Sequence, residues 1–291
     1  MRYLRSFLFV PASKKNMLDK ISEIDSDAFI LDLEDSVSSG VKADARKNVA
    51  SILSSLKEKG KNIFVRINEA GSEDSIKDLK KTYSPIIDGF VIPKFENTGS
   101  VKDIIEILEE LEGSCNNKKT GLILMIESPK GVLGLRRLAL SNNNTVLERL
   151  KGIALGGEDY LESITVSRNL SKEVLAPIRN EIMIFSHSFG ILAIDTVYPN
   201  FRDKKGLEEE THKIASMGFT SKLAIHPSQT GIINKAFYPR LDEIEKIKLI
   251  ISRKEEIIKE GAIDINGEMY DMPHLKWALK LKKYIYDTEK G

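Results

Sequence analysis

The sequence is poor in cysteine and histidine, and its charges nearly cancel. Among 291 residues Cys115 is the only cysteine, which excludes an intramolecular disulfide and a cysteine-rich zinc site. Lysine and arginine total 44 against 43 aspartates and glutamates, so the net charge of +1 gives no support for a nucleic-acid partner or a membrane surface. The single cysteine fits a reducing compartment, and we expect a cytoplasmic protein.

Long apolar stretches are also missing. No segment approaches the roughly 20 apolar residues that a membrane-spanning helix requires. The N-terminal stretch "MRYLRSFLFVPASKK" places arginines before a short apolar run, as a signal peptide does, but Pro11 and two lysines end that run. We therefore expect these apolar residues to form a first core strand.

Eight short apolar segments recur along the chain instead. Most are continuous rather than alternating, which suits strands that are covered on both faces. They are "RSFLFVP", "AFILDLED", "NIFVRIN", "GFVIPK", "LILMIES", "GIALGGED", "ILAIDTVY" and "KLAIHPSQ".

Helical patterns lie between these segments, and the alternation predicts a TIM barrel of eight parallel strands with surrounding helices. Apolar residues from Ala45 to Leu56 and from Val101 to Leu111 recur at helical spacing. A doubly wound sheet is the competing architecture. It would need a glycine-rich turn after the first strand for a dinucleotide, and "VPASKKN" offers none.

Two further helices are expected after the eighth strand, over Leu241 to Ile258 and about Pro273 to Tyr286. The segment "GAIDINGEMYDMP" between them is expected to be a loop. The sequence thus predicts a catalytic barrel over residues 1–238. A C-terminal helical extension over residues 239–291 would carry a lid loop.

Charged and polar residues stand where the predicted strands end. In a TIM barrel these ends converge on the face that carries the active site. They are Asp32 and Glu34, Arg66 and Asn68, Lys94, Glu127, Glu158 and Asp159, Asp195, and His226. Carboxylates dominate this set, and oxygen-only ligands suit a hard ion such as Mg²⁺. We expect Mg²⁺ and Arg66 to neutralise the acids of "LDLED", with Asp32, Glu34 and Asp35 behind the direct metal ligands.

Nine short motifs also occur in the order found in a known family. They are "RSFLFVPAS", "LDLEDSV", "FVRIN", "IPK", "MIESPKG", "GGEDY", "AIDTVY", "GFTSKLAIHPSQ" and "GEMYDMP". With them the chain resembles the citrate lyase beta subunit family, within the wider HpcH/HpaI aldolase group that includes malyl-CoA and citramalyl-CoA lyases. The resemblance runs over most of the chain. It implies a Mg²⁺-dependent TIM barrel that cleaves or forms a carbon–carbon bond beside an acyl thioester.

The resemblance implies roles for individual residues. Glu127 of "MIES" and Asp159 of "GGEDY" match the family's metal ligands, and Arg66 of "VRIN" matches an arginine that holds substrate oxygens. Asp271 of "MYDMP" matches an aspartate that works as acid or base and comes from a neighbouring subunit, in a homotrimer or a dimer of trimers. If Asp271 is buried among its apolar neighbours, its pKa is expected to be raised.

A further set of residues matches positions where relatives hold the acyl-CoA. These are Phe9, Lys14, Lys15, Ile225 and His226. The first motif commonly reads "VPG" in the family, and here Ala12 replaces the glycine. Where phosphates or pantetheine approach the backbone closely, this change would alter binding of the carrier. Coenzyme A and a carrier protein therefore both remain open as the thioester carrier.

The implied reaction follows from charge development. The substrate would be a 3-hydroxy-3-carboxy acyl thioester of the malyl-, citramalyl- or citryl-CoA type, with Mg²⁺ on its hydroxyl and carboxylate. Loss of the hydroxyl proton would release a 2-oxo acid and a thioester enolate. Arg66 would offer a planar fork to paired oxygens, and Asp271 would handle the proton that quenches the enolate.

Other functions remain open on the same residues. The chain could be the beta subunit of a multi-subunit citrate lyase, acting on citryl carrier protein together with an alpha subunit. It could hydrolyse the thioester as a malyl-CoA thioesterase does, or run a malate synthase-like condensation. A barrel that binds acyl-CoA without turnover is the non-enzymatic alternative. The presence of Arg66, Glu127, Asp159 and Asp271 together argues against it.

Each assignment also has a structural alternative. Glu127 could cap the helix that begins in "ESPKG", Arg66 could pair only with nearby acids, and His226 could be packed in its loop. Lys14 and Lys15 could form a solvated helix start. We expect no chemistry from four further residues, namely Asp195, His187, His212 and His274.

Overall fold

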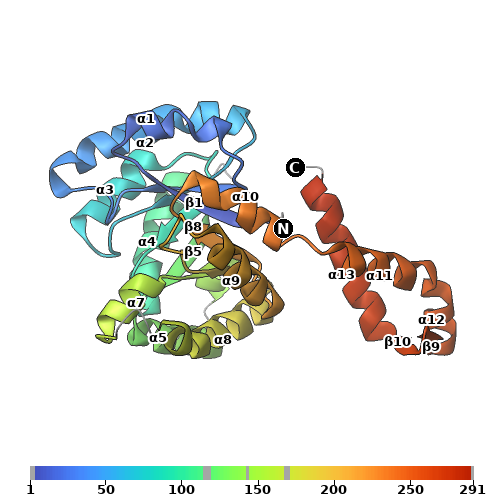
Figure 1. Cartoon of the computed structure of the whole chain (residues 1–291). Helices are drawn as coiled ribbons and strands as arrows, with labels where there is room; N and C mark the ends of the chain where they lie inside the picture. The colour runs from blue at the N-terminus through green and yellow to red at the C-terminus, as the bar shows by residue number, and fades with distance from the viewer. Residues whose placement is uncertain (1–3, 114–118, 142–143, 167–170, 290–291) are drawn as a thin grey trace. The chain divides into compact units, whose positions relative to one another are not determined.

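Eight parallel strands close into a barrel, which confirms the TIM-barrel prediction. The computed structural model describes residues 4–113, 119–141, 144–166 and 171–289, so Cys115 lies outside the described residues. The strands pair in chain order, and β1 pairs with β8 to complete the ring (Figure 1). They are β1 (Ser6–Pro11), β2 (Ala28–Asp32), β3 (Asn62–Arg66), β4 (Gly89–Ile92), β5 (Gly121–Ile126), β6 (Leu150–Leu155), β7 (Leu192–Asp195) and β8 (Ser221–Ala224).

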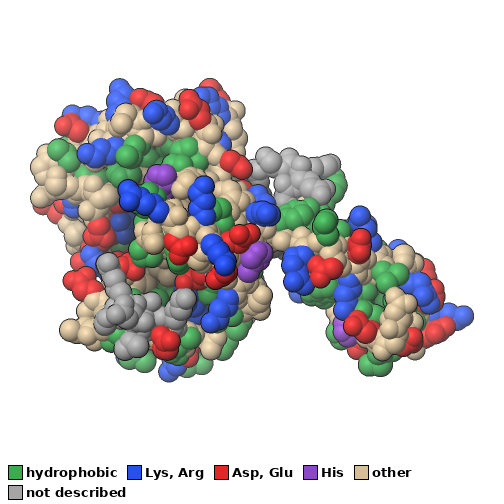
Figure 2. Space-filling view, viewed as in Figure 1, with side chains coloured by type: hydrophobic (Ala, Val, Ile, Leu, Met, Phe, Trp, Pro, Cys, Tyr) green, Lys and Arg blue, Asp and Glu red, His purple; other side chains and the backbone are tan. Residues whose placement is uncertain are grey.

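Helices connect the strands and cover their outer faces (Figure 1). Both predicted helix faces pack inward: α4 (Thr98–Glu112) buries Val101, Ile104 and Leu108, and α2 (Lys42–Glu58) buries Val49 and Leu53. Charges of both signs mix over the visible surface (Figure 2), as the near-neutral composition implies. The helices are α1 (Lys15–Leu18), α2 (Lys42–Glu58), α3 (Glu73–Thr82), α4 (Thr98–Glu112), α5 (Pro129–Leu140), α6 (Asn144–Arg149), α7 (Gly157–Ser163), α8 (Ser171–Phe189), α9 (Lys204–Ser216) and α10 (Pro227–Ala236). Among the described residues, none of the helices has the length and apolar character needed to cross a bilayer.

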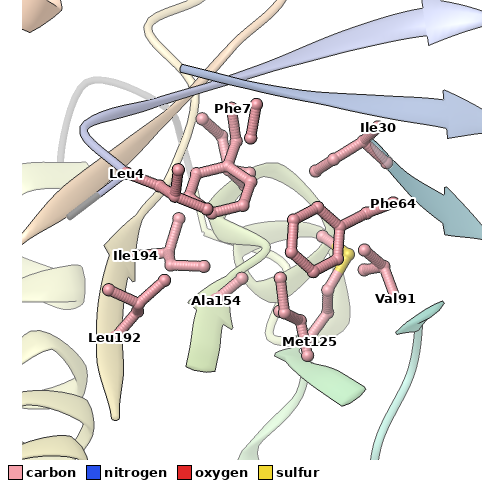
Figure 3. Packing of buried hydrophobic residues seen from close by; sticks show 12 residues of the cluster. Leu4, Phe7, Ile30, Phe64, Val91, Met125, Ala154, Leu192 and Ile194 are labelled. Carbon is pink, nitrogen blue, oxygen red and sulfur yellow. The ribbon is translucent and has the colours of Figure 1, made fainter. Parts of the chain in front are cut away.

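Alternate strand residues fill the barrel interior. Phe7 and Phe64 pack with ring centroids 5.5 Å apart, and aliphatic side chains from the other strands close around them (Figure 3). Successive side chains on a strand point to opposite faces, so only every second residue can reach this cluster. The cluster consists of Leu4, Phe7, Ala28, Ile30, Phe64, Val91, Ile123, Met125, Ala154, Leu192, Ile194 and Leu223.

The same alternation decides where the strand-end charges point. Asp32, Arg66 and Glu127 each stand two residues beyond an interior residue of their strand, so they continue the inward-facing row at the carboxyl end. Asp195 instead follows the inward-facing Ile194 directly, so it points to the helix layer. The sequence analysis placed Asp195 with the other strand-end residues at the site, but in β7 its side chain points away from the barrel interior.

The chain divides into two compact units, Leu4–Asn234 and the residues from Lys235 onward. The second unit has its own apolar cluster, in which Ile250, Ile257 and Tyr270 are buried. The single helix expected from Leu241 to Ile258 is wrong. The structure has α11 (Leu241–Ser252) and α12 (Lys254–Glu260), because the backbone leaves helical geometry at Arg253, with φ −102° and ψ 16°. The break lets Ile257 pack into the same cluster as Ile250.

The expected loop before the last helix is a β-hairpin. Strands β9 (Ala262–Ile265) and β10 (Glu268–Asp271) pair antiparallel, and α13 (Met272–Glu289) follows directly. Asn266 and Gly267 form the two-residue turn with φ values of 56° and 84°, and Asn-Gly is the preferred sequence for that geometry.

A buried ion network joins β7 and β8 to the helices outside them. Lys222 and Asp195 are fully buried, with Lys222 Nζ 2.6 Å from Asp195 Oδ2 and 2.8 Å from Glu210 Oε1. Arg179 Nε lies 2.7 Å from Asp195 Oδ1. Burial alone would raise the pKa of Asp195, but Lys222 and Arg179 outweigh it and hold that pKa below its usual value. Asp195 therefore has the structural role that the sequence predicts.

We predict that Lys222→Met lowers the free energy of unfolding by about 3–5 kcal/mol, because it leaves Asp195 buried with less compensating charge. Urea unfolding monitored by circular dichroism measures the change. Lys205→Met is the matched control, since Lys205 is exposed and lies 3.7 Å from Glu209, and it should leave the midpoint almost unchanged. Equal midpoints for both variants would contradict a strong buried network.

Candidate active site

A pocket of about 660 Å³ opens at the carboxyl ends of the barrel strands. Its walls come from segments that follow β2, β3, β4, β5 and β6, and they carry six carboxylates and one lysine. Three of the strand-end residues expected to converge here line the pocket, namely Lys94, Glu127 and Asp159. Its wall does not include Asp32, Glu34, Arg66, Asn68, Glu158, Asp195 or His226. The lining residues are Asp35, Glu69, Ala70, Lys94, Glu96, Asn97, Ser100, Glu127, Ser128, Asp159, Glu162 and Ser163.

Glu127 is the buried acid of this pocket, with 4% of its surface exposed. Its Oε2 accepts the backbone N–H of Lys94 at 2.8 Å, whereas its Oε1 has no hydrogen-bond partner among the described residues. Burial raises the pKa of Glu127 to about 7, and the charges of Glu34 and Asp159 add to the effect. The cap of α5 is Ser128, which accepts the N–H of Gly131 at 3.1 Å, so Glu127 does not cap that helix.

Asp159 is the second carboxylate, in the first turn of α7. Burial raises its pKa, and the charge of Asp35 raises it further against the opposing charges of Arg66 and Lys94. Two carboxylates with raised pKa values, one with an orphaned buried oxygen, form a site short of positive charge. Mg²⁺ binds through one or two carboxylates and completes its shell with water and substrate, so the residues fit this ion. Among the described residues there is no group of three or more acids, cysteines or histidines that would make a closed metal cage.

Arg66 lies among the acids of "LDLED". Its Nε and Nη2 donate to the two oxygens of Asp32 at 2.6 and 2.8 Å, and its Nη1 lies 2.9 Å from Glu34 Oε2 and 3.2 Å from Asp35 Oδ2. Burial alone would raise the pKa of Asp32, but the ion pair with Arg66 holds it below its usual value. Asp32 thus occupies a pair of guanidinium N–H groups of the kind that was expected to bind substrate oxygens. Nη1 faces Glu34 and Asp35, so acids contact every nitrogen of this guanidinium.

Lys94 contributes more than its place at a strand end suggests. Its backbone is left-handed, with φ 48°, and this turn directs its N–H to Glu127. Its Nζ donates to Glu34 Oε1 at 2.8 Å, which raises the pKa of Lys94. Burial nevertheless outweighs Lys94 and Arg66 and leaves the pKa of Glu34 raised. Nothing in the sequence signals the left-handed backbone, because that region favours glycine.

Of the expected CoA contacts, Phe9 packs against one of these charged groups. The guanidinium of Arg66 lies 4.9 Å from the Phe9 ring centroid, a cation–π contact. Lys14 caps α1 and Lys15 begins it, and both side chains are exposed. Ala12 is fully buried and does not have a positive φ, so the replaced glycine is not needed for backbone conformation at that point.

The two remaining expected contacts follow β8. Ile225 is 44% exposed, and His226 is exposed as well, so it is not packed in the core. The imidazole of His226 stacks on Phe201, with ring centroids 4.7 Å apart, and its Nδ1 lies 2.8 Å from Ser228 Oγ. None of these side chains lines the pocket.

Asp271 lies in the second unit, and it is not buried in this chain, so the condition for a raised pKa is not met. Its carboxylate is a third exposed, and His274 Nδ1 lies 2.6 Å from its Oδ1. This hydrogen bond lowers the pKa of Asp271. His274, from which the sequence predicted no chemistry, is thus the direct neighbour of the candidate acid. A histidine three residues after an aspartate, at a helix start, is the signal that could have indicated it.

We predict that Glu127→Gln stabilises the metal-free protein at about pH 8 and abolishes its response to Mg²⁺. Folding raises the pKa of Glu127 from 4.5 to about 7. The contribution of protonated Glu127 to folding stability is therefore complete below pH 4.5 and is lost as the pH rises through 7. Glutamine stays neutral at every pH. Thermal unfolding at about pH 5 and pH 8, with Mg²⁺ or EDTA, measures both effects. Glu69→Gln in the exposed pocket wall should change neither, and a Mg²⁺ shift retained by Glu127→Gln would refute this role.

Gly156 leaves the space that Glu127 occupies. A Cβ atom on Gly156 would lie 2.3 Å from Glu127 Cγ and 2.9 Å from its Oε1. We predict that Gly156→Ala folds but loses most of the stabilisation by Mg²⁺, because Glu127 must move. Gly231→Ala is the control, since a Cβ there meets nothing within 4 Å. Equal Mg²⁺ shifts in the two alanine variants would show that the position of Glu127 is not critical.

Comparisons with known proteins agree with this architecture. The chain is 33% identical over 277 residues to the citrate lyase subunit beta of Haemophilus influenzae, covering 94% of both chains. It is 29% identical to the mitochondrial citramalyl-CoA lyase of Mus musculus, covering 94% of this chain and 83% of that one. The crystal structure of protein CitE from Mycobacterium tuberculosis in complex with magnesium, acetoacetate and coenzyme A superposes with a TM-score of 0.74 at 25% identity, covering 98% of this chain and 100% of that one. Residues 5–227 match the HpcH/HpaI aldolase/citrate lyase family, and the chain belongs to that family.

Proposed function

We propose that this protein is a Mg²⁺-dependent carbon–carbon lyase. It would cleave a 3-hydroxy-3-carboxy acyl thioester of the malyl-, citramalyl- or citryl-CoA type to a 2-oxo acid and an acetyl thioester. The observation that carries the proposal is the unpartnered, buried Oε1 of Glu127 in a pocket shared with Asp159. The relatives named citrate lyase subunit beta and citramalyl-CoA lyase support the same class.

Glu127 and Asp159 would hold the ion. When bound, Mg²⁺ would neutralise their charges and polarise the substrate's hydroxyl and carboxylate. Lys94 holds Glu127 in place through its backbone N–H, and Gly156 leaves the space for it. Asp32, Glu34 and Asp35 would act behind the ligands, since their contacts are with Arg66 and Lys94.

Arg66 would bind substrate oxygens through Nη1, in place of Asp35 or Glu34, while Asp32 fixes Nε and Nη2. A guanidinium held on one side loses little rotamer freedom when it binds substrate oxygens on the other. As the carbon–carbon bond breaks, the electron pair passes into the thioester enolate. Asp271 would then deliver a proton to the enolate carbon.

The extension would bring Asp271 to a neighbouring subunit, in a homotrimer or a dimer of trimers. Of the 17 large apolar side chains that are exposed among the described residues, eight lie beyond residue 239. Such a density in so short a segment is typical of a surface that another chain covers. The eight are Leu241, Leu249, Ile258, Met269, Met272, Trp277, Leu279 and Tyr286.

A second candidate is the beta subunit of a multi-subunit citrate lyase, with an alpha subunit and a carrier protein as partners. The identity to citrate lyase subunit beta favours it. Phe9, Lys14, Lys15, Ile225 and His226 would contact coenzyme A or the equivalent arm of the carrier. Hydrolysis of the thioester, a malate synthase-like condensation and binding without turnover are separate outcomes of the test below. A cytoplasmic location fits all of them.

An assay of the purified chain with malyl-, citramalyl- and citryl-CoA, with Mg²⁺ or EDTA, tests the proposal. We predict lyase turnover that EDTA abolishes and Mg²⁺ restores. Arg66→Lys should reduce kcat/KM roughly 100-fold, because lysine keeps the charge and loses the planar array of donors. Turnover in EDTA, or near-normal kinetics of Arg66→Lys, would refute the assigned roles. Release of free coenzyme A without a 2-oxo acid would identify a thioesterase.

Co-expression of an Asp271→Asn chain with a Glu127→Gln chain tests the shared site. We predict partial recovery of activity in the mixed oligomer, because some sites then combine an intact Glu127 with an intact Asp271. Each variant alone should assemble normally and remain inactive. Absence of recovery in properly assembled mixtures would show that Asp271 does not act on a neighbouring chain.

A further inference from the structure

His274 contacts Asp271 in a way that the proposed reaction does not yet use. Asp271 ends β10 and His274 lies in the first turn of α13, so the strand-to-helix junction places them together. Nδ1 of His274 lies 2.6 Å from Asp271 Oδ1, and the backbone N–H of His274 donates to the same oxygen at 3.3 Å. A carboxylate only accepts hydrogen bonds, so the proton of this contact belongs to Nδ1.

Neighbouring groups hold the imidazole in this orientation. Tyr270 packs edge-on against it, with ring centroids 5.4 Å apart. The Tyr270 hydroxyl donates to Glu268, and Lys246 of α11 donates to the same carboxylate at 2.9 Å. Lys246 thus compensates the charge of Glu268, the other carboxylate of β10. Asp271 is therefore the acid that the imidazole contacts directly.

The contact resolves a difficulty in the proposed reaction. The hydrogen bond from His274 holds the pKa of Asp271 below its usual value, so this carboxylate is ionised at neutral pH. An ionised aspartate accepts a proton readily but has none to give, while the cleavage direction requires a donor to the enolate carbon. Imidazole changes its charge near neutral pH and can supply such a proton.

We infer that His274 positions Asp271 and supplies the proton that Asp271 passes to the substrate. The Nδ1 proton of His274 passes to the Asp271 carboxylate, and the electron pair of the thioester enolate then forms a C–H bond with that proton. The carboxylate returns to its ionised form, and a solvent proton restores the imidazolium, since His274 is about half exposed. Nothing is oxidised or reduced. This inference rests on the proposed lyase activity and on Asp271 as its acid.

Nitrogen NMR of histidine-labelled protein tests the contact without any activity. The chain has only four histidines, and the spectrum of His274→Gln assigns the signal. In the intact protein the Nδ1 proton of His274 should give a hydrogen-bonded signal, and this signal should change in Asp271→Asn, because the anionic acceptor is lost in that variant. The signals of the other three rings should not move. Identical His274 ring signals in both proteins would overturn the inference, whatever the enzyme does.

Kinetics test the role in turnover. His274→Gln should lower kcat roughly 10- to 100-fold with little change in KM, and it should remove one ionisation from the pH profile of kcat. Adding it to Asp271→Asn should cause no further loss, because the two residues act as one unit. His212→Gln, an exposed histidine of α9, is the control and should change nothing. An unchanged profile in His274→Gln would overturn the inference, whereas an inactive wild type with an intact NMR contact would overturn only the proposed lyase.

Discussion

The chain buries several like charges at one end of a barrel, and the ion pair between Asp32 and Arg66 makes this tolerable. Asp32 and Glu34 are 2% and 6% exposed, and two carboxylates so far from water would repel each other and lose hydration. The guanidinium contacts both acids and Asp35 as well. It keeps Asp32 ionised, and those carboxylates in turn raise the pKa of Arg66 above its usual value. The register of β2 and β3 places Asp32 opposite Arg66, so the sheet itself forms the pair.

Positive charge does not balance all the carboxylates at the barrel mouth equally, and the unbalanced carboxylates indicate the site. The Arg66 guanidinium balances the charge of Asp32, and the pKa of Asp32 is lowered. Glu34, Glu127 and Asp159 have less positive charge to balance them, and their pKa values are raised. A structural ion cluster would not leave a buried carboxylate oxygen without a partner, because that costs free energy without any gain. The deficit at Glu127 and Asp159 therefore supports a ligand of positive charge, which is the basis of the magnesium proposal.

Periodic features were predictable from the sequence, and features that depend on contacts between distant residues were not. Eight apolar segments gave the eight strands, and the two-residue alternation explains why Arg66 and Glu127 face inward. That Asp195 faces the helix layer also follows from the alternation, once the inward row of β7 is known. Neither the left-handed backbone of Lys94, which follows Pro93, nor the break at Arg253 coincides with a glycine, so the pattern of residue types did not indicate either feature. The hairpin could have been predicted, because the Asn-Gly of "ING" favours a two-residue hairpin turn, although we expected a loop in this segment.

The two units have opposite electrostatic environments, and a lyase of this type would use both. Carboxylates in the barrel are buried near one another, which makes them hold protons and favours exchange of those protons for a cation. Asp271 is exposed beside a histidine, which makes it release its proton and favours proton transfer. The hydrogen bond from His274 gives Asp271 its own proton source, independent of the carboxylates around Glu127. An acid carried on the second unit with its own histidine also gives a physical reason for an extension that closure of the barrel does not require.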